Sequence, residues 1–198
     1  MAKTHGILLD VDYSTSWEKK SVLSLFVKTK KGIEKFFEPN YLPYFFAIVD
    51  DAKKRAKEIA EMEFGEEKAR PKKVSEQKKE NAQNVLKLEF QSTQDLVAAR
   101  DKVAQLPFVK ETREFDIPFT KRYMIDSAIE PMNGIEITIY EKNNVLETKV
   151  VEQKDVLDGI EMAAFDLETH SPDRFSNPEK DPIISISLSS KNRTTAFL

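Results

Sequence analysis

Hydrophobic positions divide the start of the chain into strand-like runs separated by polar turns. Residues 6–13 (GILLDVDY) and 21–29 (SVLSLFVKT) are rich in Val, Leu and Ile, and the polar stretch 14–20 lies between them. Such runs, bounded by turn residues, predict an opening β-hairpin. The dense apolar run 41–49 (YLPYFFAIV) predicts the next strand.

The period of the apolar positions changes after Asp50 and becomes helical. Asp50 and Asp51 suit the positive N-terminal end of a helix, and Gly65 follows as a stop. The residues predicted to share the buried face are Ala52, Ala56, Ile59 and Ala60.

The middle of the chain predicts a strand pair, a second helix and a further strand. The highly charged stretch 67–83 is typical of a solvated hairpin tip, whereas 84–90 (NVLKLEF) alternates with period two and predicts a strand. Ser92 or Thr93 can cap the helix that follows, and Pro107 marks its end. Residues 108–117 return to strand character. The face predicted to be apolar comprises Leu96, Ala99, Val103 and Leu106.

The order of these elements over 41–117 indicates an α+β fold. Strand, helix, strand pair, helix and strand form the βαββαβ pattern of a ferredoxin-like or RNA-recognition-like (RRM-like) unit. Residues 133–153 then predict a hairpin that turns at Asn143 and Asn144. We therefore place a first domain at 1–130 and a second region at 131–198.

Composition narrows the class of protein. Of 198 residues 40% are apolar and 33% are charged, as expected of a globular chain, and no apolar run is long enough to span a membrane. The absence of cysteine fits a reducing compartment, so we expect a cytoplasmic protein without a membrane partner. Two histidines leave little room for a histidine metal centre, so any metal would be a hard cation held by oxygen. The net charge of −3 argues against a uniformly basic surface but leaves a local basic groove open.

The segment 164–169 (AFDLET) places two carboxylates at the end of an apolar strand-like run. Asp166 and Glu168 are two residues apart, so a strand presents both on one face, while Phe165 and Leu167 point to the other. Two neighbouring anions repel one another unless a cation lies between them. Mg²⁺ or Mn²⁺ would suit these oxygens, and paired ions cleave phosphodiesters, the chemistry of RNase H-like nucleases. The alternative is an exposed strand end whose acids reach solvent.

Several segments, taken together, resemble the archaeal family B replicative DNA polymerases. Residues 7–13 (ILLDVDY), 42–49 (LPYFFAIV), 92–103 (STQDLVAARDKV) and 116–126 (DIPFTKRYMID) precede AFDLET in the family's order. The resemblance covers nearly the whole chain. It implies an N-terminal domain followed by the first strands of an RNase H-like 3′–5′ exonuclease domain. Asp166 and Glu168 match the metal-binding acids of the first exonuclease motif, which would act on single-stranded DNA ends with Mg²⁺ or Mn²⁺.

The same resemblance implies a pocket that captures uracil from the single-stranded template. Thr93 and Leu96 depart from the proline and valine common at their positions, and a bulkier Leu96 would narrow the pocket. Aromatic and proline surfaces suit a splayed base, and arginines suit its flanking phosphates. The matching residues are Tyr13, Pro43, Tyr44, Thr93, Leu96, Arg100, Ile117, Pro118, Phe119 and Arg122.

Other interpretations stay open at this point. The polymerase motifs and the remaining exonuclease motifs are not in this sequence, so the chain would be a cut piece or one subunit of a split polymerase. Its partners would then be template DNA and the other polymerase domains, on the same or a separate chain. Alternatively, the βαββαβ unit is an RNA-binding or single-stranded DNA-binding module without uracil specificity. Without the resemblance, Tyr13, Tyr44 and Phe119 would be core aromatics and Arg100 a surface cation.

Overall fold

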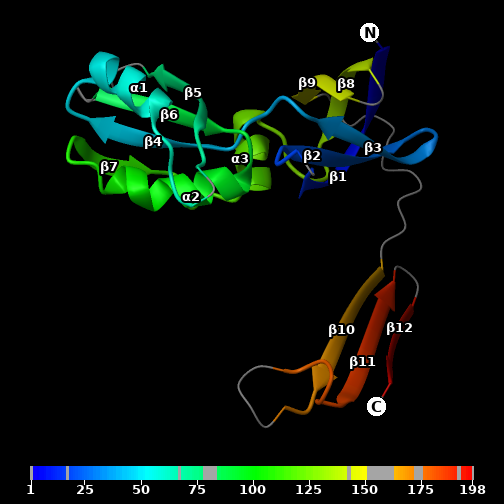
Figure 1. The fold of residues 1–198 in the computed structure, drawn as a ribbon. Coiled ribbons are helices and arrows are strands. Elements are labelled where there is room, and N and C mark those ends of the chain that lie inside the picture. Colours follow the sequence, from blue (N-terminus) through cyan, green and yellow to red (C-terminus); the bar gives the residue numbers. More distant parts are fainter. Residues whose placement is uncertain are drawn as a thin grey trace. The chain divides into compact units, whose positions relative to one another are not determined.

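The protein is an α+β chain that divides into two compact units, Met1–Val156 and Leu157–Leu198. The computed structural model describes residues 2–16, 18–66, 68–77, 84–141, 144–150, 163–171, 176–190 and 193–197. Residues 78–83 of the charged stretch and Asn143 of the predicted turn lie outside this range. Each unit is described by itself (Figure 1).

A closed barrel forms one part of the first unit (Figure 1), with strand order β1-β2-β3-β9-β8. The predicted opening hairpin is present as the antiparallel pair β1 and β2, and the later hairpin as the antiparallel pair β8 and β9. A parallel bridge from Phe37 to Asn144 closes the ring between β3 and β9. The barrel strands are β1 (Ala2–Thr15), β2 (Ser21–Thr29), β3 (Gly32–Glu38), β8 (Gly134–Glu141) and β9 (Asn144–Val150).

The barrel depends on close contact at Gly6. This residue pairs with Ile135 of β8 while β2 crosses beside it. A Cβ atom at Gly6 would lie 2.5 Å from the carbonyl oxygen of Lys28 and 2.5 Å from Cγ1 of Val27. The missing side chain therefore lets β1 and β2 approach one another. Alternate residues of β2 fill the interior, which is why Leu23, Leu25 and Val27 are fully buried.

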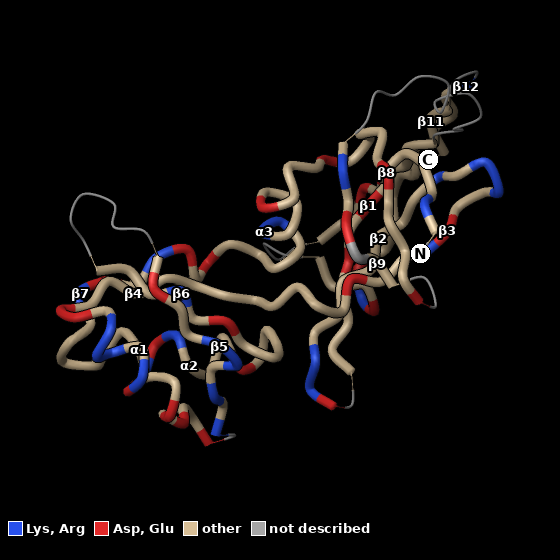
Figure 2. Tube along the Cα trace, turned by 90° about the horizontal axis from the view of Figure 1, so that it is seen from above, with Lys and Arg blue, Asp and Glu red and all other residues tan. Residues whose placement is uncertain are grey.

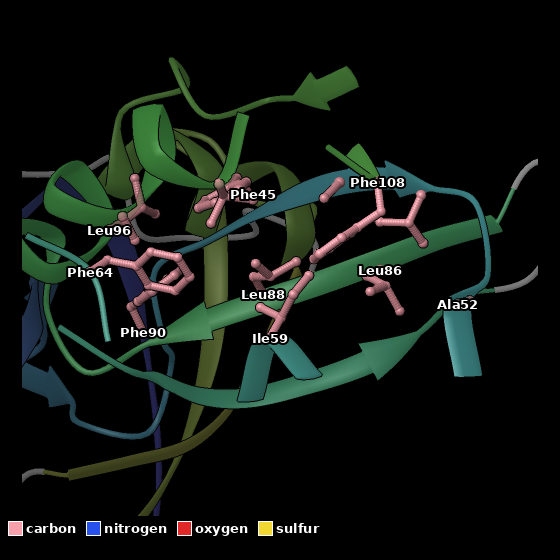
Figure 3. Packing of buried hydrophobic residues seen from close by; sticks show 13 residues of the cluster. Phe45, Ala52, Ile59, Phe64, Leu86, Leu88, Phe90, Leu96 and Phe108 are labelled. Atoms are coloured by element: carbon pink, nitrogen blue, oxygen red, sulfur yellow. The ribbon is translucent and has the colours of Figure 1, made fainter. Parts of the chain in front are cut away.

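Between β3 and β8 the chain forms an antiparallel sheet of order β5-β6-β4-β7 with two helices. Leu86, Leu88 and Phe90 are fully buried, so the period-two prediction for this strand is confirmed. Both helices contribute to the same apolar cluster as these residues and therefore cover the same face of the sheet (Figure 3). In chain order the elements are β4 (Tyr44–Val49), α1 (Ala52–Glu61), β5 (Pro71–Glu76), β6 (Asn84–Phe90), α2 (Thr93–Ala104) and β7 (Val109–Arg113).

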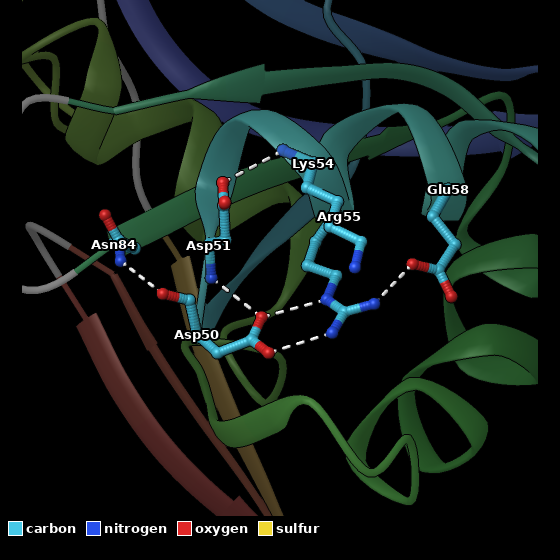
Figure 4. Close-up of polar contacts among 6 residues, drawn as sticks. All are labelled: Asp50, Asp51, Lys54, Arg55, Glu58 and Asn84. Atoms are coloured by element: carbon cyan, nitrogen blue, oxygen red, sulfur yellow. Dashed lines mark hydrogen bonds and ion pairs between the residues drawn. The ribbon is translucent and has the colours of Figure 1, made fainter.

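The two acids predicted at the start of α1 hold its first turn (Figure 4). Asp51 is the N-cap, and its side chain accepts a hydrogen bond from the amide of Lys54. Asp50 instead accepts two hydrogen bonds from Arg55, both of 2.8 Å, and Arg55 also donates to Glu58. The Arg55 guanidinium thereby lowers the pKa of Asp50 below its usual range. The sequence pattern thus predicted the start of α1 correctly.

Several local predictions need correction. Ala60 is exposed, so the buried face of α1 is narrower than predicted. The charged stretch that we predicted to be a hairpin tip also contains a strand, β5, which is the first strand of the predicted pair because its backbone pairs with β6. The strand predicted at 108–117 is confined to β7, and Glu114 just beyond it has a φ of 61°. The pattern also did not predict β3 or the short helix α3 (Phe119–Asp126).

The predicted boundary at residue 130 differs from the division of the structure. The hairpin of β8 and β9, which we grouped with the second region, pairs with β1 and completes the barrel. The first unit therefore extends to Val156.

The second unit contains an antiparallel sheet of order β10-β11-β12. Phe165, Leu167 and Phe197 on this sheet are exposed, at 72%, 44% and 59%. Apolar side chains of this sheet are therefore uncovered. The strands are β10 (Ala163–Thr169), β11 (Ile183–Ser190) and β12 (Arg193–Phe197).

Charges of both signs are interspersed along α1 and α2 rather than separated into one basic face (Figure 2). Among the described residues, no helix has the length and apolar character needed to cross a membrane.

Candidate nucleic-acid pocket and carboxylate pair

A cavity of about 250 Å³ lies in the first unit. It forms where strand β1, the start of β4, helix α2 and the start of α3 meet. Every residue that sequence resemblance assigned to the pocket lines it: Tyr13, Pro43, Tyr44, Thr93, Leu96, Arg100, Ile117, Pro118, Phe119 and Arg122. The cavity also has four lining residues that the resemblance did not indicate: Val97, Phe115, Asp116 and Thr120.

Aromatic rings form one side of this cavity. The ring of Tyr13 meets that of Phe119 edge to face, with centroids 5.4 Å apart. Tyr41, which is not among the residues lining the cavity, stacks on Phe119 at 5.7 Å and contacts Tyr44 at 6.4 Å. Tyr13 is 39% exposed whereas Tyr44 is 7% exposed, so the aromatic wall runs from the surface inward.

A nearly buried guanidinium lies beside these rings. Arg122 is 7% exposed, and its guanidinium carbon lies 5.0 Å from the centroid of Tyr44. Its Nη2 atom is 2.6 Å from the Glu114 carboxylate, although this ion pair lacks hydrogen-bond geometry. Nε and Nη2 of Arg122 have no hydrogen-bond partner among the described residues. A buried donor without a partner is costly, so Nε of Arg122, which has no ion-pair contact of this kind in the described part of the chain, favours an acceptor.

Helix α2 supplies another part of the cavity lining. Ser92 caps the helix by accepting a hydrogen bond from the amide of Asp95, which settles the choice between Ser92 and Thr93. Leu96 is 8% exposed and belongs to the apolar cluster beneath the sheet as well as to the cavity wall. Arg100 lies one turn further along α2, and its guanidinium carbon is 6.0 Å from the ring centroid of Phe115.

Helix α3 begins at the cavity. Pro118 is the N-cap and makes no side-chain capping hydrogen bond. The first hydrogen bond of the helix runs from the amide of Arg122 to the carbonyl of Pro118, at 2.8 Å. The amides of Phe119 and Thr120, two lining residues, precede that bond and belong to the group that a helix leaves without internal partners.

The carboxylates of Asp166 and Glu168 lie on one face of β10, as the alternation of a strand requires. Asp166 pairs with Ser187 and Glu168 with Ser185 of β11, so this face is polar. Both acids are exposed, and Asp166 accepts a hydrogen bond from the following amide, that of Leu167. Carboxylate oxygens suit Mg²⁺ or Mn²⁺. The part of the chain that the structure describes nevertheless contains no group of three acidic, histidine or cysteine side chains suited to a metal.

Known proteins resemble this chain in both sequence and fold. Residues 110–197 match the family described as DNA polymerase family B, exonuclease domain. DNA polymerases of Thermococcus sp. (strain GE8) and Thermococcus gorgonarius are each 32% identical over 187 residues, which is 91% of this chain. The aligned part is 10% of the first relative and 21% of the second, so the chain spans only a small share of their length.

A solved structure agrees in fold. The family B DNA polymerase of the archaeon Pyrobaculum calidifontis matches 98% of this chain and 26% of its own, with a TM-score of 0.72 and 21% identity. On the sequence relatives and the family match, the chain belongs to the family B DNA polymerases. It corresponds to their N-terminal domain together with the beginning of the exonuclease domain, and its relatives are archaeal.

Proposed function

We propose that this chain is the N-terminal part of a DNA-directed DNA polymerase, acting in replication in the cytoplasm, and that it binds single-stranded template and captures uracil in the cavity. The observation that carries the proposal is that all residues assigned by resemblance line one cavity. Its volume of about 250 Å³ is small for a ligand site and suits a single base.

Steric exclusion explains how such a site would separate uracil from thymine. The two bases differ by one methyl group at C5, so their hydrogen-bonding edges cannot distinguish them. Tyr13, Pro43 and Phe119 would contact the base closely, and forcing a methyl group into a packed site costs about 1–3 kcal/mol. Cytosine presents a donor where uracil presents an acceptor, so a backbone amide at the start of α3 would reject it.

The arginines would bind the phosphates of the DNA strand rather than the base. Arg122 and Arg100 line the cavity, and Nε of each has no hydrogen-bond partner among the described residues, although Arg122 forms an ion pair with Glu114 and Arg100 with Asp101. Phosphate oxygens are strong acceptors for such groups. Because phosphate contacts are salt-dependent, affinities must be compared at one salt concentration.

Fluorescence anisotropy tests this function directly. Matched single-stranded oligonucleotides would each carry one uracil, thymine or cytosine at the same position. We expect the tightest binding to the uracil strand, by about tenfold, the factor that 1.4 kcal/mol represents. Equal affinities for all three strands would reject uracil capture and leave only general DNA binding.

For the second unit we propose an RNase H-like fold in which Asp166 and Glu168 are two of the carboxylates of a 3′–5′ exonuclease site. When bound, Mg²⁺ or Mn²⁺ would activate water and stabilise the leaving oxygen. The remaining ligands would come from the other motifs of the exonuclease domain, which are not in this sequence. Calorimetric titration with Mn²⁺ should show a weak site that is lost in Asp166→Ala.

A second candidate is an RRM-like module that binds RNA or single-stranded DNA without uracil specificity. The order β5-β6-β4-β7 with both helices on one face favours it. Such modules stack bases on aromatic residues of central strands. In β6, however, Phe90 is fully buried, and Lys87 and Glu89 form an ion pair with each other. β6 therefore offers little for base stacking, and the cavity, which every residue assigned by resemblance lines, is the better-supported nucleic-acid site.

A further inference from the structure

One oxygen of the Asp126 carboxylate accepts hydrogen bonds from two tyrosines. The hydroxyl of Tyr41 donates over 2.7 Å and that of Tyr44 over 2.6 Å, both to Oδ2. Asp126 is the last residue of α3, Tyr44 is the first residue of β4, and Tyr41 precedes that strand. The carboxylate thus ties the end of α3 to the segment that carries the inner aromatic residue of the cavity.

Neither Asp126 nor Tyr41 lines the cavity, but each contacts a residue that does. Tyr44 lines the cavity, and Asp126 holds its hydroxyl. Tyr41 stacks on Phe119 with an interplanar angle of 25° and meets Tyr44 at 66°. Tyr41 therefore lies between two rings of the cavity wall, with its own hydroxyl fixed by Asp126.

The negative charge of Asp126 makes these hydrogen bonds strong enough to orient the rings of Tyr41 and Tyr44. A hydrogen bond to a carboxylate is shorter and about twice as strong as one between neutral groups. Burial, followed by the hydrogen bond to Asp126, raises the pKa of both Tyr41 and Tyr44, so both hydroxyls remain protonated donors at neutral pH. Asp126 itself is exposed, so water can solvate its remaining oxygen.

We propose that Asp126 is a positioning residue for the cavity: it fixes Tyr44 directly and Phe119 through Tyr41, and so sets the preference for uracil over thymine. This inference rests on the uracil-binding function proposed above. Discrimination against one methyl group requires rings that cannot move aside, and the paired hydrogen bonds supply that rigidity. Asp126 acts on base selectivity without touching the base.

The test compares Asp126→Ala with Asp126→Asn in the full chain. Both substitutions remove one negative charge, so they change general attraction to DNA equally. Asparagine keeps a carbonyl oxygen that can accept from both tyrosines, whereas alanine keeps no acceptor. We expect the uracil-to-thymine affinity ratio to fall about tenfold in Asp126→Ala and to be largely retained in Asp126→Asn.

Tyr41→Phe is the companion variant because it removes one hydroxyl and preserves the ring that stacks on Phe119. It should lower the ratio by a smaller factor than Asp126→Ala. Thermal unfolding of each variant identifies the folded ones, and ¹³C NMR of Cζ-labelled tyrosine reports loss of the hydrogen bonds without any DNA. Signals of two tyrosines should move in Asp126→Ala.

The outcomes are distinguishable. An unchanged ratio in folded Asp126→Ala, with a clear uracil preference in the unmodified chain, would overturn the positioning role alone. Equal losses of the affinity ratio in Asp126→Ala and Asp126→Asn would also overturn it, because the charge of Asp126 rather than its hydrogen bonds would then determine the ratio. No uracil preference in the unmodified chain would instead reject the proposed function, and the positioning role with it.

Discussion

The rings of Tyr13 and Phe119 meet edge to face, with centroids 5.4 Å apart and planes at 89°. Tyr13 belongs to β1 of the barrel, whereas Phe119 begins α3 after the four-stranded sheet. This contact joins the first strand of the unit to a helix that follows the four-stranded sheet, and both belong to one cavity wall. The candidate base site therefore depends on the folding of the whole unit rather than on any single motif.

Replacing Gly6 by alanine should destabilise the first unit. The new methyl group would lie 2.5 Å from the backbone oxygen of Lys28, so β1 or β2 would have to shift. Overpacking of this kind costs about 1–3 kcal/mol. Urea unfolding followed by circular dichroism measures the loss. Ser14→Ala on the same strand is the control, because Ser14 is exposed and should change stability little.

Shortening Leu96 to valine should have opposite effects on stability and on binding. Leu96 is 8% exposed and packs in the apolar cluster, so losing one methylene should cost about 1 kcal/mol of unfolding free energy. The same change enlarges the cavity, because it restores the smaller valine that is common at this position in the family. We expect tighter uracil binding by anisotropy together with a lower urea midpoint. Unchanged affinity would show that Leu96 does not restrict the base.

Alkaline pH should weaken the fold through the tyrosines around Asp126. Burial, followed by the hydrogen bond to Asp126, raises the pKa of Tyr41 and Tyr44 above the ordinary value of 10.0. Because the folded pKa lies above the unfolded one, their stabilising contribution is complete below about pH 10 and decreases as the pH rises further. Stability measured between pH 9 and about pH 11 should fall less in the Tyr41→Phe, Tyr44→Phe double variant. An equal decrease in both proteins would contradict the assignment.

The chain alone should not degrade DNA. Asp166 and Glu168 supply only part of the coordination that two metal ions require, and a poorly ligated Mg²⁺ keeps its water and binds weakly. Incubation with 3′-labelled single-stranded DNA and Mg²⁺ or Mn²⁺ should leave the label intact. Shortening that disappears in Asp166→Ala would show that the described carboxylates suffice.

Amides of β11 and β12 should exchange with solvent earlier than those of β2 and β6. Ile183, Ile184 and Leu188 are about half exposed, so little apolar burial opposes opening of this sheet. In contrast, Leu25 and Leu88 are fully buried in the first unit. Hydrogen exchange with mass spectrometry at several protein concentrations measures this difference. Equally slow exchange throughout the chain at low concentration would contradict it.

Local sequence patterns predicted the elements whose apolar residues recur with the period of a strand or of a helix. The strand β6 and the face of α2 formed by Leu96, Ala99 and Val103 follow from short-range chemistry, which also narrowed the cap of α2 to Ser92 or Thr93. The face shared by Asp166 and Glu168 follows from strand alternation in the same way. Resemblance to a family, rather than pattern, selected the cavity residues, because aromatic residues in a strand are equally compatible with a core.

Tertiary structure decided the features that depend on distant partners. β5 is a strand because β6 provides hydrogen bonds to a charged segment with no apolar alternation. The later hairpin joins the first unit because β1 has a free edge beside it, a relationship that no local pattern encodes. Tyr41 and Asp126 converge only because α3 returns to the start of β4. Local propensity acts over a few residues, whereas strand pairing and side-chain convergence require the folded chain.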